Sequence, residues 1–170
     1  MATHLKPEEY NSYYATYINL VEEQDIVISL KQGFDETFAF LNSIPEERWV
    51  FSYAEGKWNI KEIVQHLLDT ERVFTYRALS FSRKETQALP GYDQDEYLEQ
   101  SNANSRTKES LIEEYKSIRN ATITLYKSFN SDMLMRIGTA SGSPLSVRAA
   151  GYITAGHEKH HCKIIQEKYL

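Results

Sequence analysis

The sequence is poor in residues that interrupt helices and in residues that cross-link chains. Its 170 residues include seven glycines, four prolines and one cysteine. The single cysteine, Cys162, excludes a disulfide within the chain, so we expect a reducing compartment. The low content of glycine and proline favours a mostly helical protein with few turns.

The sequence also lacks long runs of apolar or basic residues. No segment approaches eighteen consecutive apolar residues, and the N-terminus lacks the apolar stretch of a signal peptide. We therefore expect a cytoplasmic protein with no membrane partner. With 19 basic and 24 acidic residues, the formal net charge is −5. This balance argues against a nucleic acid as the main partner and leaves a small-molecule substrate as the expected one.

Four stretches carry apolar residues at the three-four spacing of a buried helix face. They begin at Asp25, Asn59, Thr107 and Ser146. Asn59 has Glu62 three residues later, which is an asparagine variant of the capping box, and Thr107 and Ser146 are suitable N-caps. A chain of this length is most simply one domain, residues 1–170. The sequence thus predicts an all-α protein built as a four-helix bundle.

The segments between these helices differ in length and character. Residues 45–57 form a connector too short to carry a sheet, and residues 134–144 contain glycines and a proline that predict an irregular segment or a small hairpin. Residues 84–106 form a long polar connection. A connection of this length crosses over the end of a bundle or covers a pocket.

Tyrosines are concentrated near the N-terminus, at Tyr10, Tyr13, Tyr14 and Tyr17. One interpretation is an amphipathic flap over the bundle, with the hydroxyl groups kept near water. The other interpretation is that these side chains line a substrate pocket.

Three histidines fall at positions where a helix faces the core. His157 and His161 are four residues apart and therefore share one face of the last helix, and His66 lies in the inward row of the second. Buried imidazoles need partners, and a metal ion is the commonest shared partner. The string from His157 to His161 also matches the zinc-protease motif, with Glu158 as its general base. Few residues follow His161, so a third ligand must come from upstream, and His66 is the candidate.

Two segments resemble the DinB-like superfamily: KWNIKEIVQHLLDTER at residues 57–72 and GHEKHH at 156–161. Shorter matches occur at residues 76–79, 89–92 and 145–148. The resemblance implies an up-down-down-up four-helix bundle with a long crossover connection, often a homodimer. It also implies zinc or nickel held by His66, His157 and His161. The superfamily includes transferases that use a low-molecular-weight thiol such as bacillithiol or mycothiol.

Three neutral imidazoles leave an open position on a tetrahedral zinc ion. Water there would serve a metal-dependent hydrolase, whereas a thiol would serve a transferase. The resemblance favours the thiol. The non-enzymatic alternative is a stress-related binding module in which the metal stabilises the bundle.

Four further residues are candidates for supporting roles around the metal: Glu158, His160, Thr70 and Arg77. Glu158 could act as a base, could be solvated, or could orient an imidazole N–H. His160 lies off the inward row. Arg77 and Arg148 could bind an anion if they reach the pocket. We also expect a homodimer, because aromatic residues make up 12% of the chain and part of them lies outside the predicted core rows.

Overall fold

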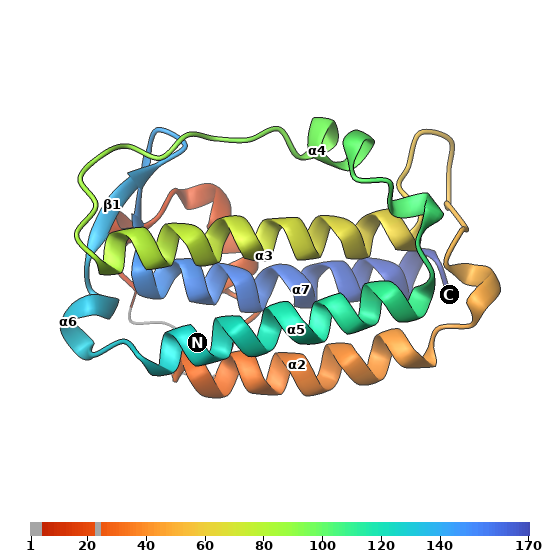
Figure 1. Ribbon diagram of the computed structural model, residues 1–170, viewed down its shortest axis with the longest axis horizontal. Helices are drawn as coiled ribbons and strands as arrows, with labels where there is room; N and C mark the ends of the chain where they lie inside the picture. Colours follow the sequence, from red (N-terminus) through yellow and green to blue (C-terminus); the bar gives the residue numbers. More distant parts are fainter. Residues whose placement is uncertain (1–4, 23–24) are drawn as a thin grey trace.

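The computed structural model describes residues 5–22 and 25–170, and four long helices dominate it (Figure 1). They are α2 (Ile26–Ser43), α3 (Ile60–Ser82), α5 (Lys108–Lys127) and α7 (Val147–Lys168). All four predicted core helices are therefore present. Asn59, Thr107 and Ser146 are the N-caps of α3, α5 and α7, and the capping box between Asn59 and Glu62 is formed, as predicted.

The long helices form a bundle in which α2 and α7 run one way and α3 and α5 run the other (Figure 1). Both α2 and α3 pack against α5 and α7, so α2 lies diagonally opposite α3. The parallel helices α3 and α5 are joined by the long crossover connection. The predicted all-α, up-down-down-up bundle is confirmed.

The core is divided along the bundle axis into two apolar clusters. One cluster includes Ile18, Phe74 and Ile153, and the other includes Trp49, Leu68 and Leu111. Buried polar side chains from α3, α5 and α7 lie between them in sequence, among them Glu71, Arg119, His157 and Glu158, and the buried His66 lies beside His157. The helices therefore carry a polar layer across the middle of an otherwise apolar core.

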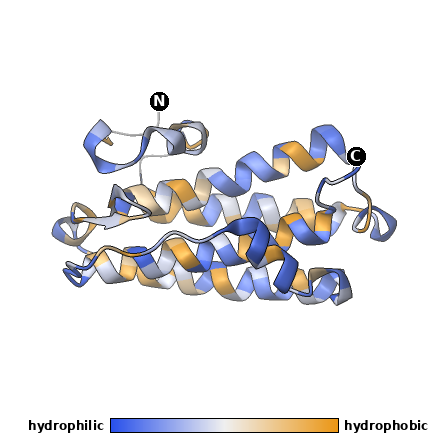
Figure 2. Cartoon of the chain, turned by 90° about the horizontal axis from the view of Figure 1, so that it is seen from above, coloured by the Kyte–Doolittle hydropathy of each residue, from blue (hydrophilic) through white to orange (hydrophobic). Residues whose placement is uncertain are grey.

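The crossover connection runs along α3 rather than over one end of the bundle (Figure 1). It contains helix α4 (Gln94–Gln100) and a 3-10 turn at Ala103–Ser105, where the sequence analysis predicted a long polar connection and no particular helix. Asp93 caps α4 by accepting hydrogen bonds from the N–H groups of Asp95 and Glu96. Figure 2 shows that α4 is mostly hydrophilic. Its sequence therefore lacks the apolar row by which the long helices were predicted.

A small hairpin closes the end of the bundle before α7. A short helix, α6 (Ser131–Leu134), leads into strands β1 (Ile137–Ala140) and β2 (Ser143–Ser146), which pair antiparallel. The turn residues Ser141 and Gly142 have positive φ angles of 52° and 73°. The hairpin alternative predicted for this segment is confirmed. Leu89 of the crossover connection forms a bridge with Ala140 and so attaches the connection to the hairpin.

The N-terminal segment forms short 3-10 helices at Pro7–Glu9 and Ser12–Tyr14 and helix α1 (Ala15–Ile18), which packs against α7. Its anchor is the buried carboxylate of Glu9. This carboxylate accepts hydrogen bonds from the Ser146 hydroxyl, the Arg148 guanidinium and the backbone N–H of Lys6. Arg148 therefore pairs with Glu9. Within the described ranges, no helix is long and apolar enough to cross a membrane.

Replacing Glu9 with glutamine should lower the free energy of unfolding by about 1–3 kcal/mol, because it removes a charged acceptor from a buried network. Burial raises the pKa of Glu9, but the hydrogen bonds from Arg148, Lys6 and Ser146 outweigh it and leave the pKa below its ordinary value. A carboxylate with a lowered pKa stabilises the fold above its unfolded pKa and loses that effect as the pH falls. The difference in the free energy of unfolding between wild type and E9Q, measured with urea, should therefore become smaller below about pH 4.5. The control Glu8→Gln, at an exposed position, should leave the free energy of unfolding almost unchanged.

Candidate metal centre

The structure brings the three predicted histidines together in the polar layer. His66 comes from α3, and His157 and His161 come from successive turns of α7, which packs antiparallel to α3. The Nε2 atom of His157 lies 3.1 Å from Nε2 of His66 and 3.0 Å from Nε2 of His161. One nitrogen from each ring falls within 4.8 Å of the others.

Packing fixes the orientation of the rings. The Trp58 ring lies against the His66 ring with 4.9 Å between centroids, and Tyr17 meets His157 edge-on at 5.0 Å. Trp58 immediately precedes the N-cap of α3, so the capping box that starts the helix also places the indole over His66. The tryptophan in the sequence motif therefore has a direct structural role.

All three rings are neutral at pH 7. Burial lowers the pKa of His66 to about 4 and is the largest cause in His161, whose pKa falls to about 3. Burial also sets the pKa of His157 well below its ordinary value, with the neighbouring imidazoles lowering it further. A neutral imidazole offers a lone pair, which is the form that binds a metal ion.

The residues present fit a divalent cation. The Nε2 atom of a neutral imidazole carries either one proton or one lone pair, so His157 Nε2 cannot make two good hydrogen bonds to its neighbours. One cation would accept the lone pairs of all three rings. Zinc–nitrogen distances of about 2.0–2.1 Å place tetrahedral ligand atoms about 3.3 Å apart, which is near the 3.1 and 3.0 Å that separate His157 Nε2 from the other two rings.

Thr70 and Tyr92 extend the site on the side of His66. The Thr70 hydroxyl lies 3.4 Å from Nδ1 of His66, a long contact, and 2.8 Å from the Tyr92 hydroxyl. Thr70 is thus placed where it can orient the His66 ring, as the sequence analysis expected of a supporting residue. Tyr92 comes from the crossover connection, and no local sequence pattern identified it as a residue of the site.

The predicted roles of Glu158 were wrong. The side chain is buried, and its hydrogen bonds go to the Tyr115 hydroxyl at 2.8 Å and to the Arg119 guanidinium at 2.6 Å, not to an imidazole. Arg119 also makes two hydrogen bonds of 2.9 Å to the carboxylate of Glu71. Glu158 is therefore neither solvated nor free to act as a protease base. It belongs to a buried ion cluster of Glu71, Tyr115, Arg119 and Glu158.

The sequence analysis missed this ion cluster, although a signal existed. Arg119 lies four residues after Tyr115 and three before Thr122, and therefore in the inward row of its helix. Opposite it, Gly33 leaves the space that Glu158 fills, since a Cβ at Gly33 would collide with the Glu158 carboxylate. A charged residue in an apolar row indicates that a buried counter-charge is needed, although the row does not identify which residue supplies it.

The two remaining side chains at the C-terminal end of the site are peripheral. His160 is half-buried and meets the Tyr17 ring at 5.2 Å and the His161 ring at 5.2 Å, edge to face in both cases. The Cys162 thiol lies 3.7 Å from the Thr37 hydroxyl, and burial raises its pKa to about 12. Cys162 is thus a protonated, half-buried thiol at neutral pH.

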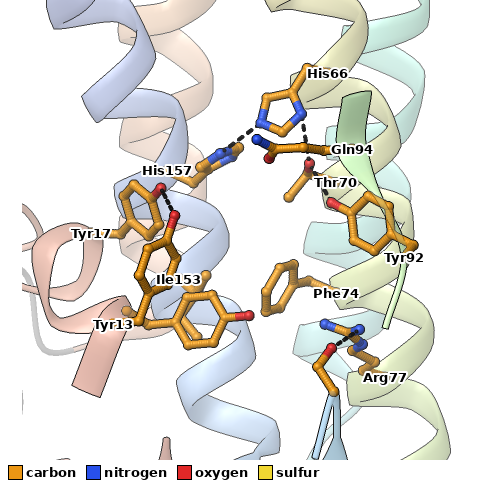
Figure 3. A pocket seen from close by; sticks show the side chains of 12 residues that line it. Tyr13, Tyr17, His66, Thr70, Phe74, Arg77, Tyr92, Gln94, Ile153 and His157 are labelled. Carbon is orange, nitrogen blue, oxygen red and sulfur yellow. Dashed lines mark hydrogen bonds between the residues drawn. The ribbon is translucent and has the colours of Figure 1, made fainter. Parts of the chain in front are cut away.

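A cavity of about 160 Å³ opens beside His66 and His157 (Figure 3). Its walls are mainly aromatic and its polar groups come from three separate segments. The aromatic residues are Tyr13, Tyr14, Tyr17, Phe74 and Tyr92, and the polar ones include Thr70, Arg77, Gln94 and Ser141. Three of the four N-terminal tyrosines, Tyr13, Tyr14 and Tyr17, therefore line a pocket, which supports the second of the two interpretations for them. A separate cavity of about 360 Å³, lined by Trp58 and Tyr169 among others, reaches His161.

Gly156 allows the N-terminal segment to approach the site. A Cβ at this position would collide with the carbonyl group of Tyr17. Helix propensity alone makes Gly→Ala stabilising by about 1 kcal/mol. We expect Gly156→Ala to destabilise instead, by about 1–3 kcal/mol, because the chain must shift to relieve the overlap. Chemical unfolding measures the change, with exposed Gln166→Ala as the control; a stabilised G156A protein would contradict the close approach.

Comparisons with known proteins agree with this structure. The family model of the DinB superfamily matches residues 29–165. A protein of Oceanobacillus iheyensis named "Putative metal-dependent hydrolase OB0413" is 25% identical over 122 residues, covering 71% of this chain and 70% of the relative. The structure of YfiT from Bacillus subtilis, described as a probable metal-dependent hydrolase with an unusual four-helix bundle topology, superposes with a TM-score of 0.69. At 17% identity it covers 98% of this chain and 91% of YfiT. With the family model spanning most of the sequence and the same fold observed, the chain belongs to the DinB superfamily.

Proposed function

We propose that the protein is a metal-dependent hydrolase whose divalent ion, zinc or nickel, is held by His66, His157 and His161. The observation that carries this proposal is the convergence of three neutral imidazole nitrogens, with His66 and His157 lining an aromatic cavity. The names of the relative from Oceanobacillus iheyensis and of YfiT support the hydrolase class.

The three histidines supply three protein ligands, which is the number typical of catalytic rather than closed structural zinc sites. A divalent ion at this position would supply Lewis acidity, polarising a substrate carbonyl and making water more acidic. The chain's own residues perform the other tasks. The aromatic walls enclose the body of a substrate and exclude bulk water, and the hydroxyl groups of Tyr17 and Tyr92 offer hydrogen bonds beside the histidines.

The resemblance in sequence also implied a transferase that uses a low-molecular-weight thiol. The hydrolase is the better supported of the two, because the names of both relatives specify hydrolysis and neither mentions a thiol. Thiol transfer stays a prediction for the same site, as does a purely structural role of the metal in a binding module.

The test compares protein stripped with a chelator and protein reloaded with zinc or nickel. Each sample is assayed on a panel of 4-nitrophenyl esters with and without added cysteine, and on 1-chloro-2,4-dinitrobenzene with cysteine. We expect ester hydrolysis that requires metal and does not require the thiol. Turnover only in the presence of cysteine would establish transfer instead, and a metal-dependent rise in melting temperature without any turnover would indicate the binding module.

We further propose that the protein forms a homodimer. Several large apolar side chains are more than half exposed: Tyr13, Val50, Tyr76 and Tyr97. Aromatic residues are enriched in protein interfaces, and a specific dimer should bury at least about 1,000 Å² in total. Light scattering coupled to size exclusion at micromolar concentration should give twice the mass of the chain, and a monomer mass would refute the dimer.

A further inference from the structure

Arg77 is a buried cation without a carboxylate partner among the described residues. Its side chain is 3% exposed. One terminal nitrogen, Nη2, donates to the carbonyl oxygen of Pro90 at 3.1 Å and to the hydroxyl of Ser141 at 2.8 Å, and both acceptors are neutral. Across residues 5–22 and 25–170, no carboxylate oxygen lies within 4.0 Å of this guanidinium.

This arrangement differs from that of the other buried arginine. Arg119 contacts two carboxylates, Glu71 and Glu158, whose charges compensate its own. A buried charge without a counter-ion is costly, so an anionic ligand at Arg77 would relieve an existing cost rather than create a new one. The Nε and Nη1 groups of Arg77 make no hydrogen bond with any described residue, which leaves donors for a planar anion such as a carboxylate.

Arg77 lies at the opposite end of the cavity from His66 (Figure 3). Both residues belong to α3 and are eleven positions apart, which corresponds to about three turns, or about 16 Å along the axis. Both side chains therefore emerge on the same face of the helix. Long helical side chains lean toward the N-terminus, which brings the guanidinium back along the cavity toward the histidines.

The wall between these two ends is apolar and aromatic. The Phe74 ring lies 5.2 Å from the Arg77 guanidinium carbon, and the Tyr14 ring meets Phe74 edge-on with 5.6 Å between centroids. Figure 3 shows Phe74 between Arg77 and the Thr70–His66 pair. A ligand that spans the cavity therefore meets a cation, then an aromatic wall, then the imidazoles of His66 and His157.

We propose that the substrate is a small organic anion. Its carboxylate binds Arg77, its apolar body packs against Phe74 and Tyr14, and its hydrolysable ester or amide group lies at the histidines. In the reaction, water adds across the acyl bond, giving a second carboxylic acid and releasing an alcohol or amine. The identity of the reacting group rests on the proposed hydrolase, whereas anion recognition by Arg77 rests on the cavity alone.

The experiment measures binding to metal-free protein, so that its result does not depend on hydrolysis. Calorimetric titrations compare 3-phenylpropionate with its neutral analogue 3-phenylpropionamide. We expect the carboxylate to bind at least about tenfold more tightly, which corresponds to about 1.4 kcal/mol. Arg77→Gln should remove this preference and Arg77→Lys should retain part of it, because lysine keeps the charge but loses the planar fork of donors. Arg72→Gln, an exposed arginine on the same helix, should bind like wild type.

Equal affinity for the two probes, a lack of saturable carboxylate binding at millimolar concentration, or an unchanged preference in R77Q would each overturn the inference. The comparison of the two probes on wild-type protein needs no variant, so it stands even if R77Q does not fold. Carboxylate selectivity in a protein that hydrolyses no ester would refute the proposed hydrolase and leave the anion site intact. Metal-dependent hydrolysis without carboxylate selectivity would refute the anion site and leave the proposed hydrolase intact.

Discussion

Replacing His157 with alanine should abolish metal binding and lower any metal-dependent hydrolysis by more than about 100-fold. His157 is the central member of the three histidines, with Nε2 atoms of the other two 3.0 and 3.1 Å away. Loss of a supporting residue around a metal ligand already costs about 10–100-fold, so loss of a ligand should cost more. Elemental analysis of protein purified without a nickel column should find about one ion per wild-type chain and almost none in H157A.

The matched control for this experiment is His160→Ala. His160 lies on the same helix and beside His161, but its contacts are ring-edge contacts with Tyr17 and His161. A ligand present at 100 times its dissociation constant stabilises the folded state by about 2.7 kcal/mol, so added zinc should raise the melting temperature of wild type and H160A but not of H157A. Equal metal content in wild type and H157A would refute the three-histidine site.

The second large effect is expected at Arg119. Replacing it with leucine should lower the free energy of unfolding by about 3–5 kcal/mol, because the change leaves the carboxylates of Glu71 and Glu158 buried without a counter-ion. Burial by itself lowers the pKa of Arg119, but the charges of Glu158 and Glu71 outweigh it and raise the pKa well above its ordinary value. Since total stability is about 5–15 kcal/mol, this loss is a large fraction of the stability of the protein. Urea unfolding followed by circular dichroism measures the loss.

Two comparisons separate the buried ion cluster from a general effect of losing an arginine. Arg72 pairs with Glu114 at the surface, and Arg72→Leu should cost less than about 1 kcal/mol. The triple variant R119L/E71Q/E158Q should recover part of the stability lost in R119L, because it removes the two uncompensated charges. An R119L protein as stable as R72L, or a triple variant less stable than R119L, would show that Arg119 does not stabilise the fold by compensating the buried carboxylates.

The helices could be predicted because their signals are local. Asn59, Thr107 and Ser146 each cap a helix by accepting a hydrogen bond from the N–H group three residues later, and each was recognised from the sequence. The buried face of each long helix could be predicted for the same reason, because the three-four spacing of apolar residues is also a local signal. Helix α4 was missed because its cap, Asp93, precedes a mostly polar segment without an apolar row.

The candidate metal centre was predictable in its histidines and not in its surroundings. Helical spacing places His157 and His161 on one face, but the partners of Glu158 come from α5, and nothing in the local pattern identifies Arg119 as one of them. Charged residues are normally exposed, so a sequence pattern assigns Glu71 and Glu158 to the solvent by default. Tyr92 and Ser141 reach the cavity through the crossover connection and the hairpin turn, whose positions depend on tertiary packing.

The order of the helices in the bundle also determines how the chain can fold. The consecutive helices α2 and α3 lie diagonally opposite each other, and the neighbouring helices α3 and α5 are parallel and joined by the crossover connection (Figure 1). An antiparallel pair such as α3 and α7 brings together residues as distant in sequence as His66 and His157. The contact order of this bundle is therefore higher than that of an up-down-up-down bundle, in which each helix packs on the next. Because folding rates fall as contact order rises, this chain should fold more slowly than a simple helical bundle of the same length.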